Sequence, residues 1–225
     1  MQKNISVIVV ANDNFESLEK VIWSYNTQAF RNFEMIIVNQ NSDETISKSI
    51  TSIQKEVFFP IVLLNFDKEN NGDDCVKKAI EIASTNYILI TNSDCLARPD
   101  FVEQHIKNRV EGYFLNGTSY AIHTSVSDKI SQEIIYSSKC FQMSWLKSKG
   151  IGFFRSFMIS YSGLLSTFLD AIFSKNDISS DNLSGWKSDF IQINSFTNLK
   201  INNLKEIDLK QKNIKSRAIL LKLQN

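Results

Sequence analysis

The sequence predicts an α/β fold, with a mostly parallel central sheet flanked by helices and a smaller lobe towards the C-terminus. Three observations favour this fold. Short apolar runs alternate with segments of helical periodicity four times over about the first hundred residues. The runs are predominantly apolar at successive positions, which is typical of parallel strands buried on both faces. Polar clusters follow them directly, as expected at the ligand-binding edge of an open α/β sheet.

The alternating elements occupy the first half of the chain. Apolar runs mark the expected strands, at residues 5–10, 33–38, 61–64 and 87–90. Helices are expected between them, at residues 15–25, 44–55 and 76–83. Pro99 begins a further helix, because the N–H that proline lacks is not needed in the first helical turn. This order of strands and helices predicts a parallel sheet covered on both faces.

The regular alternation fades after Gly112. Residues 113–122 suit a strand or a hairpin, and residues 147–173 are rich in phenylalanine and leucine at nearly helical spacing. Residues 204–223 carry six lysines and arginines against two acids, with apolar residues that partly share a helical face. We therefore divide the chain into an α/β half at 1–112, a lobe of the same domain at 113–203 and a basic amphipathic tail at 204–225.

The composition excludes several classes of protein. Of the 225 residues 43% are hydrophobic, enough for a substantial core, and a net charge of +1 gives no general argument for binding nucleic acid. Only 7 glycines and 2 prolines occur, which excludes low-complexity or collagen-like structure. Cys75, Cys95 and Cys140 are too widely spaced to indicate a zinc site or a disulfide framework, so we expect buried thiols in a reducing cytoplasm. We expect neither a signal peptide nor a membrane-spanning helix.

The polar cluster Asn92-Ser93-Asp94 is the most informative part of the chain, because it follows directly after the run at 87–90. Ligands of open α/β sheets bind at the carboxyl ends of the strands, so Asp94 lies where a ligand or metal ion would be met. Mg²⁺ and Mn²⁺ prefer oxygen ligands, and one or two carboxylates often suffice when substrate phosphates and waters supply the rest. The alternative is that Asp94 caps the helix that begins at Pro99.

Five consecutive segments between residues 5 and 108 are similar to one enzyme family in order and in spacing. They are Ile5-Ser6-Val7-Ile8-Val9; residues 24–34, which match S-x-x-x-Q-T-F-x-x-F-E; residues 79–88, which match G-I-x-x-A…Y-I; Asn92-Ser93-Asp94, at an Asp-x-Asp position; and Pro99-Asp100-Phe101, at P-D-F. The sequence thereby resembles the family-2 glycosyltransferases, which use nucleotide sugars. The resemblance implies the GT-A (Rossmann-like) α/β fold with an acceptor-side lobe.

The resemblance also implies roles for the residues at the strand ends. Asp94 would hold Mn²⁺ or Mg²⁺, which neutralises the diphosphate leaving group of a sugar nucleotide. Gln40 would bind the nucleotide base, with Asn39 supporting the turn, since an amide offers both a donor and an acceptor. A plain polar loop is the alternative there. The other residues expected at the nucleotide pocket are Ala11, Asn12, Asp13, Asn92 and Ser93, of which Asp13 is equally suited to cap the following helix.

A weaker resemblance continues in the second half of the chain. Asn176-Asp177-Ile178 and Gly185-Trp186-Lys187-Ser188-Asp189 are similar to the N-G-F-D…G-W-G-x-E-D segment of galactosyltransferase-like members. The resemblance implies that Asp189 is the catalytic base, which takes the proton of the acceptor hydroxyl. Asp181 and Asp177 are alternatives for this role, and an exposed acid without a catalytic role is another reading of Asp189. Trp186 would stack against an acceptor sugar or pack in the lobe.

Several positions depart from the family pattern. Asn39 and Gln40 replace the paired aspartates of the family's base-binding loop. Asn92 replaces the first aspartate of Asp-x-Asp, and Val76 stands where an arginine is expected near the start of the helix at Gly72. No histidine follows His123, so a late histidine metal ligand of some relatives is absent. These departures motivate an alternative function: a catalytically weakened homologue that binds a nucleotide or glycan, or supports a partner transferase.

The resemblance implies an inverting, metal-dependent transferase. It would move a hexose or N-acetylhexosamine from a UDP-sugar to a glycan or lipid-linked glycan in bacterial surface polysaccharide or glycoconjugate synthesis. We expect no nucleic-acid partner and a cytoplasmic location, at the inner face of the membrane if the tail at 204–225 makes peripheral contact. A tail helix docked on its own domain is the alternative. The phenylalanines around 153–173 are expected to form the core of the lobe.

Overall fold

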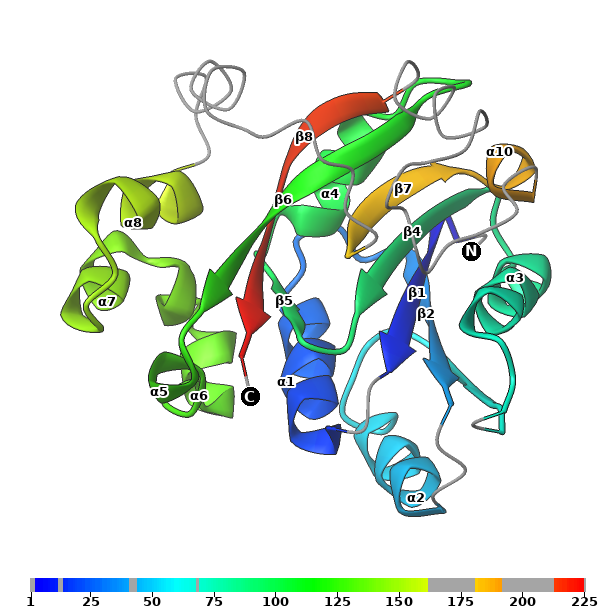
Figure 1. Cartoon of the computed structure of the whole chain (residues 1–225), viewed down its shortest axis with the longest axis horizontal. Coiled ribbons are helices and arrows are strands. Elements are labelled where there is room, and N and C mark those ends of the chain that lie inside the picture. The colour runs from blue at the N-terminus through cyan, green and yellow to red at the C-terminus, as the bar shows by residue number, and fades with distance from the viewer. Residues whose placement is uncertain are drawn as a thin grey trace.

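The computed structural model describes residues 3–11, 14–40, 44–67, 69–161, 181–191 and 213–224. Within these ranges the strands form one eight-stranded sheet in the order β3-β2-β1-β4-β7-β6-β8-β5 (Figure 1). The strands are β1 Ile5–Ala11, β2 Phe33–Asn39, β3 Ile61–Asn65, β4 Tyr87–Asn92, β5 Cys95–Ala97, β6 Phe114–Ile122, β7 Asn182–Trp186 and β8 Asn213–Leu223.

Helices connect and cover these strands. They are α1 Phe15–Asn26, α2 Glu44–Ile53, α3 Gly72–Ile82, α4 Phe101–Lys107, α5 Thr124–Ser127, α6 Gln132–Tyr136, α7 Met143–Ser148, α8 Phe153–Ser160 and α10 Lys187–Ile191, with a short 3₁₀ helix at Lys139–Phe141. Among the described residues, no helix is both long and apolar enough to pass through a bilayer.

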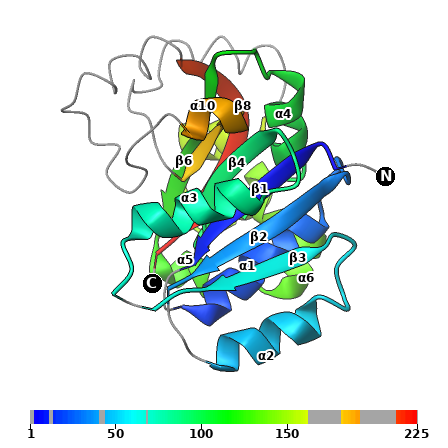
Figure 2. The same ribbon diagram turned by 90° about the vertical axis from the view of Figure 1, so that its right-hand side faces the viewer.

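The first half of the chain forms the parallel part of the sheet, which confirms the predicted α/β fold. β3, β2, β1 and β4 run side by side in one direction, with Ile8 aligned to Ile36 and to Ile90. Successive residues of β1 point to opposite faces. Val7 and Val9 pack in the cluster that includes α1, whereas Ile8 packs in the cluster that includes α3. Figure 2 shows α1 and α3 on opposite sides of these strands, so both faces are buried.

The remaining strands join the same sheet beyond β4. β7 is antiparallel to both β4 and β6, β8 is parallel to β6, and β5 is antiparallel to β8. The expectation of an amphipathic helix in the tail is wrong for residues 213–223, which form β8. The apolar run Ala218–Leu221 is fully buried between β6 and β5, so its side chains are core and not a membrane face. Residues 204–212 lie outside the described part of the chain.

The lobe around α7 and α8 also differs from expectation. Met158 and Ile159 of α8 are buried as lobe core, but Phe153 and Phe154 are 64% and 50% exposed. The helix is only eight residues long and buries one side, so aromatic residues in its first turn remain in solvent. The expected core residues beyond 161 lie outside the described residues.

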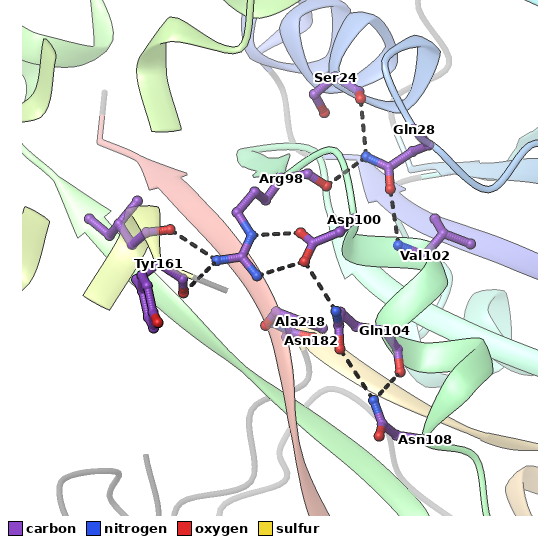
Figure 3. Close-up of polar contacts among 11 residues, drawn as sticks. Ser24, Gln28, Arg98, Asp100, Val102, Gln104, Asn108, Tyr161, Asn182 and Ala218 are labelled. Carbon is purple, nitrogen blue, oxygen red and sulfur yellow. Dashed lines mark hydrogen bonds and ion pairs between the residues drawn. The ribbon is translucent and has the colours of Figure 1, made fainter. Parts of the chain in front are cut away.

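Motif residues that resemble family signatures brace the fold (Figure 3). The amide of Gln28, 1% exposed, donates to the Arg98 carbonyl at 2.8 Å and accepts from the Val102 N–H at 3.0 Å. The Arg98 guanidinium makes a bidentate ion pair with Asp100, at 2.6 and 2.8 Å, and donates to the Ile159 carbonyl at 3.1 Å. These bonds join α1, the turn after β5 and the end of α8.

Candidate active site

The carboxyl ends of β1, β2 and β4 meet at one edge of the sheet. Ala11 is aligned with Asn39, and Val10 with Asn92. The Ser93 N–H extends this edge by donating to the Val10 carbonyl at 2.9 Å. The structure therefore brings together Ala11, Asn39, Asn92 and Ser93, as the predicted nucleotide pocket requires. Asn12 and Asp13 lie outside the described residues.

The two amides of the predicted base-binding loop have different surroundings. Asn39 is 1% exposed, and its Nδ2 donates to Asn65 Oδ1 at 2.9 Å, which links the ends of β2 and β3. This placement agrees with a role in supporting the turn. Gln40 is half-buried, and its Nε2 lies 3.4 Å from the Asn70 carbonyl, just before α3. Gln40 is therefore the amide that lies nearer solvent at this edge.

Asp94 lies in the tight turn between β4 and β5. Its carbonyl accepts from the Leu223 N–H at 2.7 Å, and its Oδ1 lies 3.2 Å from Cys95 Sγ. The alternative that Asp94 caps the next helix is wrong, because β5 intervenes and α4 begins after Asp100. The half-buried carboxylate of Asp94 instead stands at the sheet edge that the sequence indicates.

Lys222 and Asp181 complete this edge. β8 places Lys222 opposite Cys95, and its Nζ forms an ion pair with Asp181 Oδ2 at 2.8 Å. Burial disfavours the charged ammonium, but the hydrogen bond to Asp181 and the negative charges of Asp181 and Asp94 outweigh it, so the pKa of Lys222 is raised. Lys222 is therefore a fixed positive charge beside two carboxylates. The sequence motifs do not indicate Lys222, because its position at this edge depends on β8 pairing with β5.

Cys95 is packed beneath the same carboxylates. Its side chain is fully buried, and burial together with the charges of Asp94 and Asp181 raises the pKa of its thiol well above the usual value. Because the thiolate is the reactive form, a buried thiol with a raised pKa is a poor nucleophile, and Cys95 serves as packing, as expected for a buried thiol.

The structure does not bring Asp189 to this edge. Because β7 is antiparallel to β4, Trp186 pairs with Tyr87 at the amino end of β4, while Asn182 pairs with Thr91 near the carboxyl end. Asp189 follows Trp186 in α10, so the length of β4, about 16 Å at ~3.3 Å per residue, lies between it and the Asp94 turn. Asp181 immediately precedes β7 and therefore lies at the Asp94 edge. Asp177 lies outside the described residues.

Trp186 likewise packs away from the Asp94 edge. Its ring makes an edge contact with Tyr87, with centroids 5.4 Å apart, and its Nε1 donates to the Val110 carbonyl at 3.2 Å. Next to it, Lys187 Nζ donates to the carbonyls of Glu81 and Ala83 at the end of α3. These contacts attach the end of β7 to the amino edge of the sheet, so the packing alternative for Trp186 is the one observed.

A buried polar chain fixes β7 beside β4 and β6. Asn182 Nδ2 donates to the Ala218 carbonyl at 3.0 Å, so its Oδ1 faces His105 Nε2, also at 3.0 Å. His105 Nε2 therefore carries the proton, and Nδ1 accepts from Ser184 Oγ at 2.7 Å. Tyr87 donates in turn to Ser184 at 2.9 Å. His105 therefore serves as buried packing, and its network positions Asp181 through Asn182.

The oxygen donors at the edge fit a divalent cation that arrives with phosphates. Asp94 offers a carboxylate and Asn92 an amide oxygen, which are donor types that Mg²⁺ and Mn²⁺ accept. No three His, Cys, Asp or Glu side chains gather into a cage anywhere in the described ranges. A cation here would therefore take much of its coordination from the phosphates and water.

Comparison with known proteins gives the same architecture. The model of glycosyl transferase family 2 matches residues 6–162. The mannosyltransferase PcManGT from Pyrobaculum calidifontis, solved in complex with GDP-Man and Mn²⁺, matches 99% of this chain and 57% of its own at TM-score 0.60 and 8% identity. TarS from S. aureus matches 99% of this chain and 35% of its own at TM-score 0.53 and 11% identity.

These two likenesses concern the fold, because the identities are low. This chain also spans less than two thirds of the length of either protein. The family match is broader evidence, since it covers well over half of the chain and includes the β1, β2 and Asp94 segments. The predicted GT-A fold is confirmed, and the chain belongs to glycosyl transferase family 2.

Proposed function

We propose that this chain transfers a hexose or N-acetylhexosamine from a UDP-sugar to a glycan acceptor, with inversion at the anomeric carbon. The observation that carries the proposal is the position of Asp94, half-buried at the carboxyl edge beside the ends of β1 and β4. Gln40 and Asn92 belong to the same edge and offer amide groups to a base and to phosphate or ribose hydroxyls.

Charge at this edge suits a diphosphate leaving group. Asp94 would hold Mn²⁺ or Mg²⁺, which supplies a Lewis acid for the negative charge that grows on the diphosphate. Lys222 adds a second positive charge that is built into the chain, 2.8 Å from Asp181 and opposite Cys95 in the β5–β8 pair. Its ammonium can donate to a phosphate oxygen while the C-terminal strand keeps it at the site.

For the catalytic base we propose Asp181 in place of Asp189. An inverting transfer needs a carboxylate that takes the acceptor hydroxyl proton as the acceptor oxygen attacks the anomeric carbon and UDP leaves with the electron pair of the broken bond. Asp181 lies at the Asp94 edge, with a side chain 14% exposed, whereas Asp189 lies at the far end of β4. The Lys222 ammonium, 2.8 Å from Asp181 Oδ2, holds this carboxylate in place at the edge.

The acceptor and the cellular setting follow from the family resemblance. We propose a glycan or lipid-linked glycan of a bacterial surface polysaccharide or glycoconjugate as acceptor, and action in the cytoplasm at the inner face of the membrane. The tail at 213–223 is not part of this proposal, because it forms β8.

A weakened homologue that binds a nucleotide without transferring sugar is the second candidate. Two observations favour it: Asn39 uses its side-chain amide for Asn65, and Val76, where relatives have an arginine, is 2% exposed and packs in the core. Neither residue is then available to a donor substrate.

The test is nucleotide binding followed by turnover. Titration calorimetry with UDP, with and without Mn²⁺, should give metal-dependent binding that Asp94→Asn weakens by about ten-fold or more, because the metal loses its only ionised ligand on β4–β5. Asp128→Asn, at an exposed aspartate that ends α5, is the matched control. Asp181→Asn should keep UDP binding and lose UDP release from UDP-sugars with an acceptor.

The outcomes separate the two candidates. Metal-dependent UDP binding without turnover of any UDP-sugar in a panel favours the weakened homologue. Equal UDP binding by wild type and Asp94→Asn removes Asp94 from the mechanism and refutes the proposed site.

A further inference from the structure

We propose that the α7–α8 face, defined by Lys147, Lys149, Phe153, Phe154 and Arg155, docks on an anionic lipid surface. Residues 134–161 contain four basic side chains and no acidic one. The whole chain has a net charge of +1, so the remainder carries −3. The four basic side chains give this end of the molecule an excess of positive charge, which an anionic surface attracts.

The local structure turns aromatic rings outward at this end. Leu146 of α7 and Met158 and Ile159 of α8 are buried and anchor the lobe. Gly150, at φ +81°, makes the turn between the two helices, and residues 152–155 are then four consecutive exposed positions. Phe153 and Phe154 are the first two residues of α8, which Figure 1 shows at the outer end of the lobe, and both side chains are largely exposed.

Cationic groups lie beside these rings. Lys147 Nζ is 5.5 Å from the centre of the Phe153 ring, and Lys149 Nζ is 5.5 Å from that of Trp145. Arg155 is exposed and donates to the Ala121 carbonyl, which holds it beside the tip. Aromatic rings at the headgroup level with flexible ammonium groups around them are the arrangement by which peripheral proteins insert into an anionic interface.

The other exposed apolar residues of the chain do not combine rings and cations as the α7–α8 face does. Ile191 is 61% exposed on α10 and Val62 is 39% exposed on β3, each on an element other than α7 and α8. Only around α8, among the described residues, do strongly exposed phenylalanines coincide with a stretch that has basic and no acidic residues. Insertion into an anionic lipid surface uses exposed rings and cations together. A single exposed apolar residue elsewhere is ordinary on a protein surface and does not indicate a binding site.

The experiment is co-sedimentation of the full chain with vesicles. Vesicles of phosphatidylcholine are compared with vesicles of equal parts phosphatidylcholine and phosphatidylglycerol, and we expect binding to the anionic vesicles only. Lys147→Gln with Lys149→Gln should weaken that binding roughly 25-fold, at about five-fold for each cation near the surface. Phe153→Ser with Phe154→Ser should weaken it by about ten-fold or more, because the inserted apolar area is lost.

Matched controls lie on other elements. Lys78→Gln with Lys107→Gln removes two exposed lysines from α3 and α4, and Ile191→Ser removes an apolar residue about as exposed as Phe153. Both control variants should bind like wild type. Circular dichroism of each variant establishes that it is folded.

Four results would overturn the proposal. They are no binding of wild type to anionic vesicles, equal binding to both vesicle types, wild-type binding by both α7–α8 variants, or an equal loss in the controls. A concentration-dependent dimer that the Phe153 and Phe154 changes dissolve would assign this face to a second copy instead. UDP binding in solution involves none of these residues, so the test of the transferase proposal is separate.

Discussion

The buried chain around His105 makes the stability of the protein depend on pH. His105 is fully buried, and its neutral ring donates through Nε2 to Asn182 and accepts through Nδ1 from Ser184. Burial lowers the pKa of His105 to about 4, despite the hydrogen bond to Asn182 that acts in the opposite direction. Protonation would place a second donor against the Ser184 hydroxyl, which then has to reverse its bond with Tyr87.

The sign and size of the effect follow from linkage. An unfolded histidine titrates near pH ~6.5, so between that pH and about 4 the unfolded chain binds the proton that the folded chain excludes. The stability that depends on a neutral His105 is fully present above pH ~6.5 and is lost as the pH falls towards 4. About 2.5 pKa units at ~1.4 kcal/mol each amount to roughly 3 kcal/mol, a large part of the stability of a typical domain.

Urea unfolding of wild type and His105→Gln between pH 7.5 and 4.5 measures this term. The variant lowers stability at pH 7.5, but its free energy of unfolding should fall less steeply with pH, since Gln does not titrate and the carboxylates are common to both proteins. His123→Gln is the control, because His123, the other histidine, is exposed and should leave the slope unchanged. Parallel slopes for wild type and His105→Gln, or an NMR titration of His105 near pH 6.5, would refute the argument.

Two further predictions concern packing. Gly117→Ala should destabilise the chain by about 2 kcal/mol or more in urea unfolding, because the added Cβ would overlap the Asn182 amide and the Ala218 carbonyl. As the control, Gly152→Ala should be close to neutral, because its added Cβ meets nothing within 4 Å. Native protein should not react with a thiol reagent that modifies all three cysteines in urea, since each thiol is buried; rapid native modification of even one thiol would contradict the described packing.

The parallel half of the fold could be predicted because its signals are local. Each of the runs at β1, β2 and β4 is apolar on both faces, and each is followed by polar residues, so the edge with Asn39, Asn92 and Asp94 follows from strand direction alone. The motif residue Gln28 and the Pro99-Asp100-Phe101 segment also meet in the structure, where the Gln28 amide bonds the Arg98 carbonyl and the Val102 N–H on either side of that segment.

The second half could not be predicted in the same way, because its signals depend on pairing between distant segments. Residues 213–223 have a periodicity that also suits a helix, and only their place between β6 and β5 makes them a strand. The direction of β7 decides that Asp181 and not Asp189 lies near Asp94, and no residue within either segment encodes that direction locally.

By itself, the sequence determined the α/β class, the family and the carboxylate at the strand edge, since apolar periodicity and short motifs act over a few residues. The tertiary structure alone decided which distant groups share that edge. Lys222 and Asp181 are 41 residues apart in the chain and meet at 2.8 Å only because β8 and β7 enter the sheet in fixed orientations. A charge pair of this kind is a property of strand order, and strand order is set by the packing of the whole core.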